Sequence, residues 1–79
     1  MKALIIRAGD RAPAGFYRPG ALYAVWDGAN QIVGEYLGHH PGYGLPEFRP
    51  LVWRGPEAEP LRHICAGPRA QVQPIQEDT

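Results

Sequence analysis

Apolar runs separated by short polar turns recur along this chain, most clearly in the segment GALYAVWDGANQIVGEYL at residues 20–37, which is the pattern of β-strands. Residues 21–26 are apolar and aromatic, which is typical of a strand, and residues 31–37 resume an extended apolar run. Between them, Asp-Gly at 27–28 and Asn30 tolerate the positive φ that tight hairpin turns need. The pattern predicts a β-hairpin with its turn at residues 27–30.

Alternation within the first strand of this hairpin assigns its side chains to two faces. The faces are Tyr23 and Val25 on one side, and Leu22, Ala24 and Trp26 on the other. Both faces carry apolar bulk, which predicts a sheet covered at least partly on both sides. Gly34 lies inside the second strand, where a glycine is typical of a bulge or a sharp bend.

Three further runs have the composition of short strands, at residues 2–7, 48–54 and 61–65, and a single helical turn is the alternative for the last of them. Pro50 lies within the second of them, which places that run at a sheet edge or where no ladder hydrogen bond is needed. No window of eleven residues keeps a helical apolar period while avoiding Pro and Gly. About five short strands with frequent turns predict an all-β fold without substantial helix, either a small curled antiparallel sheet or an SH3-like barrel.

The pattern also divides the chain. Residues 1–66 are predicted to form a single small β domain, because the apolar runs lie there. Residues 67–79 are polar and contain Pro68 and Pro74, so we expect a loosely held C-terminal tail. The alternative is that this segment lies extended along a sheet edge.

Composition limits the cellular compartment and the partners that we expect for this protein. A chain of 79 residues buries only a small core, and its single cysteine excludes an intramolecular disulfide. We therefore expect a reducing compartment, the cytoplasm, and we see no signal peptide or stretch long enough to span a membrane. Eight basic residues balance eight acidic ones, which argues against nucleic acid or a membrane as the main partner. Seven of the eight basic residues are Arg, a usage typical of GC-rich bacteria and their phages.

Two groups of residues offer metal or catalytic chemistry. Together, the four candidate ligands match the number that a structural zinc needs. They are His39, His40, His63 and Cys65. Their spacing fits no standard zinc motif, and the alternative is loop histidines with an inert, buried cysteine. No third residue orients a Cys–His pair for catalysis, so we predict neither enzymatic activity nor a cofactor.

Eight aromatic residues are the strongest functional signal in the chain. We expect so small a core to hide about three or four of them. Exposed aromatic side chains beside Arg are typical anchors of protein interfaces. The candidate partner-binding residues are Tyr17, Arg18, Tyr43, Arg49, Trp53 and Arg54. The alternative is that both Trp26 and Trp53 lie in the core, with tyrosines at its rim.

These observations predict a small cytoplasmic protein–protein interaction module, a bacterial or phage accessory or inhibitor protein. It would present a sheet face and the loop at residues 38–45, and a free strand edge would allow self-association. A nucleic-acid-binding barrel is the first alternative. It requires one basic face built from Lys2, Arg7, Arg11 and Arg18. A zinc-stapled structural domain is the second alternative.

Overall fold

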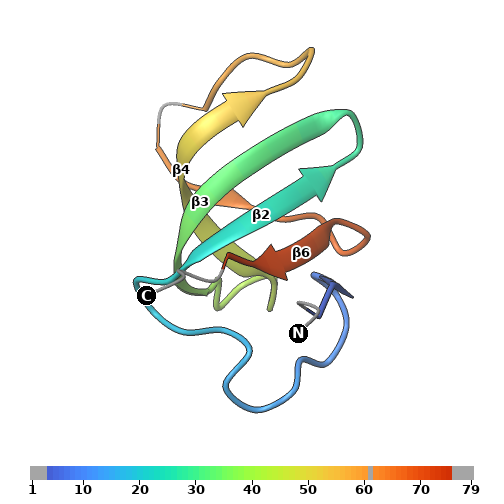
Figure 1. Cartoon of the computed structure of the whole chain (residues 1–79), viewed down its shortest axis with the longest axis vertical. Coiled ribbons are helices and arrows are strands. Elements are labelled where there is room, and N and C mark those ends of the chain that lie inside the picture. The colour runs from blue at the N-terminus through green and yellow to red at the C-terminus, as the bar shows by residue number, and fades with distance from the viewer. Residues whose placement is uncertain (1–3, 61, 76–79) are drawn as a thin grey trace.

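The computed structural model describes residues 4–60 and 62–75 and contains six strands in one antiparallel sheet (Figure 1). The strands are β1 (Ile6–Arg7), β2 (Leu22–Asp27), β3 (Asn30–His39), β4 (Pro46–Arg54), β5 (Ile64–Cys65) and β6 (Gln71–Pro74). Their order across the sheet is β1-β6-β2-β3-β4-β5, and no helix occurs in the described part of the chain. The prediction of an all-β fold is confirmed.

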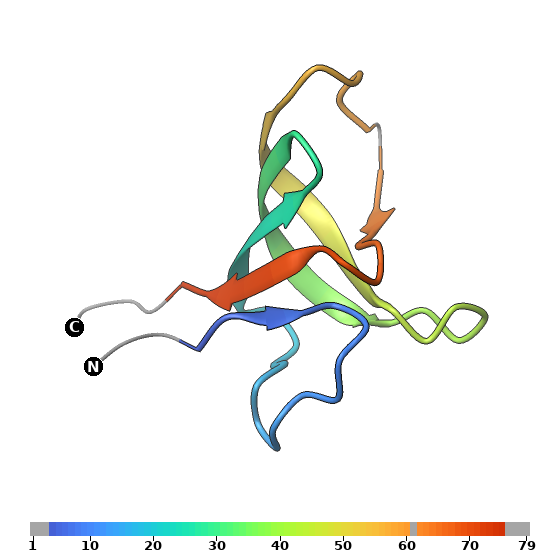
Figure 2. The same ribbon diagram turned by 90° about the vertical axis from the view of Figure 1, so that its right-hand side faces the viewer.

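The sheet curls into an incomplete barrel, as the view in Figure 2 shows. Its two outer strands, β1 and β5, each contain two residues and do not pair with each other within residues 4–60 and 62–75. Of the two predicted architectures, the structure has the curled sheet. Both outer strands are shorter than the predicted runs 2–7 and 61–65, of which residues 2, 3 and 61 lie outside the described residues.

The predicted hairpin is present as β2 and β3. Asp27 pairs with Asn30, so only Gly28 and Ala29 form the loop. Gly28 has φ 62°, whereas no residue other than glycine has positive φ among those described. A positive φ at the first loop residue alone is the pattern of a type II′ turn. Asn30 is therefore not a turn residue, as the sequence suggested, but the buried first residue of β3.

Residues 67–75 differ from the prediction of a loose tail, and residues 76–79 of the predicted tail lie outside the described residues. Residues 71–74 form β6, which pairs with β1 on one side and with β2 on the other. Val72 is fully buried and lies opposite both Ile6 and Val25. Its neighbours Gln71 and Gln73 point to the opposite side of the strand. One buried apolar side chain and backbone pairing with two strands therefore hold a segment whose sequence is mostly polar. The sheet therefore extends beyond residue 66.

Two bulges shape the longest strands. Val33 pairs with Val52 while Gly34 pairs with Pro50, which leaves Leu51 as an extra residue on β4. A second shift leaves Leu37 as the extra residue on β3. The bulge predicted at Gly34 is thus confirmed, with its extra residue on the partner strand. Pro50 is accommodated because β5 pairs with β4 at residues 47 and 48, and none of the described residues forms a strand beside Pro50 on that side.

The concave side of the curled sheet encloses the core. Four aromatic side chains are buried there: Phe16, Tyr23, Tyr36 and Phe48. This number matches the expectation that the core hides three or four of the eight. Tyr23 is 1% exposed, and its hydroxyl donates to the Phe16 carbonyl (2.6 Å) and accepts from the Arg18 N–H (2.7 Å). These two bonds attach the loop between β1 and β2 to the sheet.

Candidate functional site

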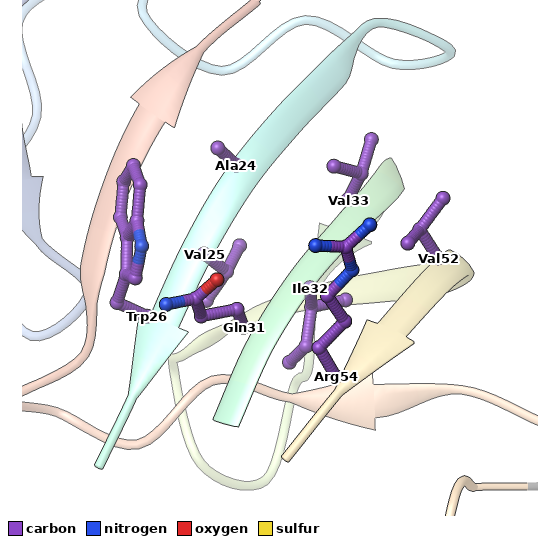
Figure 3. A pocket seen from close by; sticks show the side chains of 8 residues that line it. All are labelled: Ala24, Val25, Trp26, Gln31, Ile32, Val33, Val52 and Arg54. Carbon is purple, nitrogen blue, oxygen red and sulfur yellow. The ribbon is translucent and has the colours of Figure 1, made fainter. Parts of the chain in front are cut away.

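The convex side of β2, β3 and β4 carries two rows of side chains that point away from the core. One row is formed by Ala24, Val33 and Val52, which pair across the three strands. The next row is formed by Trp26, Gln31 and Arg54. We call these six residues the outer face. Figure 3 shows Trp26 on β2 and Arg54 on β4 with Gln31 of β3 between them, and Val33 farther along β3.

A shallow hollow of about 250 Å³ lies over this face, lined by its six residues and by parts of Val25 and Ile32. Val52 is 46% exposed, Arg54 is exposed, and Ala24, Trp26 and Val33 are half-buried. An apolar floor between an indole and a guanidinium is the composition found at the centre of protein interfaces. The sheet was predicted to be covered at least partly on both sides; its concave side is buried, whereas these residues of the convex side are half-buried or exposed.

The two arginines on this side of β4 differ in their partners. Arg49 donates from Nη2 (2.6 Å) and Nε (2.9 Å) to Oε1 of Glu35. Arg54 makes no ion pair with any described residue. Because the Arg49 charge is already balanced, Arg54 is the cation that this face offers to a partner. Of these two predicted partner-binding residues, the hollow includes Arg54 and not Arg49.

The predicted residue Tyr43 lies apart from the outer face, in the loop at residues 40–45. It is 73% exposed and its ring lies 4.7 Å from that of His40. Backbone hydrogen bonds from His40 to Leu45 (2.8 Å) and from Gly44 to His40 (2.7 Å) close the loop. The expectation that Tyr43 is exposed is confirmed, and the loop presents its ring on a closed turn.

Tyr17 and Arg18 lie in the loop that Tyr23 attaches to the sheet. Tyr17 is half-buried, stacked on Tyr36 (4.9 Å) and edge-on to His39 (4.9 Å). Burial, with smaller effects of Tyr36, Tyr23 and Asp10, raises the pKa of Tyr17 to about 12. Tyr17 thus belongs to an aromatic cluster, while the side chain of Arg18 is exposed.

Trp53 turns inward rather than outward. It lies opposite Ile32, is half-buried against the core, and its Nε1 donates to the Glu57 carbonyl (3.1 Å). This bond ties the loop after β4 to the strand. Trp26 is the aromatic residue of the outer face, and it was not among the candidate partner-binding residues. Its alternation with the buried Tyr23 and Val25 was the signal that could have found it.

The residues of the two alternative functions are spread over several elements. No group of three or more His, Cys, Asp or Glu side chains able to hold a metal occurs among residues 4–60 and 62–75. His63 lies near Glu47 (3.8 Å), whereas burial and the Glu47 carboxylate raise the pKa of the Cys65 thiol. The zinc-stapled alternative therefore has no site in this part of the chain.

For the nucleic-acid alternative, Lys2 lies outside the described residues. Arg7 belongs to β1, and Arg11 and Arg18 lie in the following loop; all three are exposed.

The described residues include no helix long and apolar enough to cross a membrane. The sequence matches no protein-family model and no curated protein, and the structure matches no solved structure.

Proposed function

We propose that this chain is a small protein-binding module and that the outer face is its main contact surface. The observation that supports the proposal is the row Ala24, Val33 and Val52, an apolar strip left accessible on a paired sheet. Accessible apolar side chains with a polar rim are typical of interaction sites. Trp26 and Arg54 border this strip, and Trp and Arg are the residue types most enriched at energetic centres of interfaces.

The sheet also provides rigidity. β3 is paired along both sides, with β2 and with β4, so the floor of the hollow is held by two hydrogen-bonded ladders. A surface ordered before binding loses little conformational entropy when a partner docks. Tyr43, on its closed loop, is proposed as a second contact. We propose that the protein acts in the cytoplasm of a bacterium or in a phage-infected cell, as an accessory or inhibitor protein without enzymatic activity.

A pull-down from a lysate of the source organism, quantified by mass spectrometry, tests the proposal with a matched pair of variants. Val52→Glu places a charge on the outer face. Ile5→Glu places the same charge on a side chain of similar exposure, 51% against 46%, beside β1 at the other end of the sheet. We expect a protein that the wild type and Ile5→Glu retain and that Val52→Glu loses.

Equal retention by both variants would contradict the outer face as the contact surface. Circular dichroism and thermal midpoints of both variants check that each is folded. The salt dependence of retention separates this proposal from the nucleic-acid alternative, because phosphate contacts weaken steeply as salt rises.

A further inference from the structure

We infer that the hollow of the outer face takes an extended peptide segment that presents a bulky apolar side chain next to a carboxylate. The inference rests on the proposed function and adds the chemistry of the partner to it. It follows from three properties of the hollow: its size, its charge and its shape.

The size of the hollow suits a side chain. Its volume of about 250 Å³ is below the ~300–1,000 Å³ typical of sites that enclose a small molecule or cofactor. The floor is made by the small or aliphatic residues Ala24 and Val33, and the indole of Trp26 forms one wall (Figure 3). A Leu, Met or Phe side chain placed there removes apolar surface from water on both partners.

The charge of the hollow favours an anion. Arg54 lines it from the β4 side and makes no ion pair with the described residues, whereas Arg49 on the same strand is balanced by Glu35. A guanidinium binds a carboxylate through two parallel hydrogen bonds. Gln31 lies between Trp26 and Arg54, where its amide can donate to and accept from the backbone of an extended peptide.

The shape of the hollow disfavours a second copy of this chain on the same face. In a face-to-face dimer with its two-fold axis along β3, the hollow of one copy would face the hollow of the other. The space left between the two sheets would deprive the lining residues of van der Waals contacts. A protruding side chain fills the same space. The occupant that satisfies size, charge and shape together is therefore a peptide with adjacent apolar and acidic residues.

Selection from a random peptide library displayed on phage tests this inference. The baits are the wild type, Arg54→Glu, and the control Arg11→Glu, which makes the same change at an exposed arginine in the loop between β1 and β2. We expect the wild type and Arg11→Glu to enrich peptides with Asp or Glu beside a bulky apolar residue. Arg54→Glu should keep the apolar preference and exchange the acidic one for Lys or Arg.

A peptide enriched by the wild type then serves as the probe for calorimetric titration. We expect Arg54→Glu and Arg54→Gln to weaken its binding about tenfold or more, and Arg11→Glu to leave it within about twofold. No enrichment, enrichment without acidic residues, or an unchanged preference in Arg54→Glu would overturn the inference. So would dimers of the wild type in light scattering that Val52→Glu dissociates.

These outcomes are separate from the fate of the proposed function. A pull-down partner lost in Val52→Glu, together with a library result that ignores Arg54, leaves the outer face as the contact surface and rejects only the acidic peptide. A partner retained by Val52→Glu rejects the surface itself.

Discussion

Trp26 and Arg54 are neighbours of the same residue, Gln31, on opposite sides of β3, and together they border the hollow of the outer face. This relationship depends on the bulge at Leu51. Counting strictly by two from the buried Phe48 would turn Arg54 toward the core and Trp53 toward solvent. The extra residue shifts the alternation of β4 by one position, so that the Arg54 side chain lies on the outer face and the Trp53 side chain packs inward.

Gly34 permits the close approach of β3 and β4 at this bulge, and Gly34→Ala should destabilise the protein. A Cβ there would lie 3.0 Å from the Phe48 Cβ and 3.2 Å from the Arg49 carbonyl oxygen. We expect a loss of about 1–3 kcal/mol in the free energy of unfolding, measured by urea denaturation. Gly67→Ala is the control, because its Cβ would lie 3.4 Å from the Asp27 carboxylate, which is an ordinary van der Waals contact. A Gly34→Ala variant as stable as this control would show that β4 moves to accommodate the added methyl group at little cost in free energy.

Tyr23→Phe should be costly although it removes a single oxygen atom. The buried hydroxyl links the Phe16 carbonyl and the Arg18 N–H, and its loss leaves both without that partner. We expect a loss of about 1–3 kcal/mol in the free energy of unfolding. Tyr43→Phe, at a ring 73% exposed, should change it by less than about 0.5 kcal/mol. Similar values for the two variants would mean that the loop is held by other contacts.

Alkaline conditions should weaken the fold through Tyr17. Its pKa is 10.0 as an ordinary tyrosine and is raised to about 12 in the folded chain by burial. Below pH 10 both states keep the proton. Between pH 10 and 12 the unfolded chain releases it while the folded chain retains it, so stability falls as pH rises. Burial also raises the pKa of Tyr36, which acts in the same direction.

The variant Tyr17→Phe isolates this effect. Urea denaturation of both proteins at several values between pH 9 and 12 should show a shallower loss of stability for Tyr17→Phe. Parallel curves would contradict the assignment of the alkaline loss to Tyr17. Because the two proteins share every other titrating group, the difference between their curves reports on the Tyr17 hydroxyl together with its electrostatic coupling to Tyr36 and Tyr23.

Tyr43→Ala separates binding from folding. Its ring is exposed and contacts His40 in a loop closed by backbone hydrogen bonds, so we expect a nearly unchanged thermal midpoint. We expect the same variant to weaken the complex with a partner identified by pull-down. Tyr36→Ala, at a buried ring, is the contrasting variant and should lower the midpoint markedly. A large loss of stability in Tyr43→Ala would refute its role as a binding residue.

Local signals were sufficient for much of the fold. The Asp27-Gly28 dipeptide predicted the turn between β2 and β3, and two-residue alternation predicted that Tyr23 and Val25 share one side of β2, which the structure then shows to be the buried side. Gly34 predicted the bulge. Each of these signals acts on residues a few positions apart, where turn geometry and the pleat alone decide the outcome.

The candidate site was less accessible to the same reasoning. Tyr43 and Arg54 were selected and are exposed, whereas Trp53 was selected and packs against the core. The inward orientation of Trp53 was not predictable because the extra residue, Leu51, has no signature in the sequence of β4. Val52 and Trp26 join Arg54 only when three strands are aligned, and that alignment depends on contacts between distant segments.

The sequence by itself determined that residues 4–60 and 62–75 form antiparallel strands without a helix, because glycine, proline and two-residue alternation act over neighbouring positions. Only the tertiary structure decided that residues 71–74 lie between β1 and β2, and that an indole, two valines and a guanidinium share one accessible face. The physical reason is that pairing between distant strands is selected by burial. The mostly polar residues 71–74 join the sheet because the Val72 side chain is buried in the core between β1 and β2.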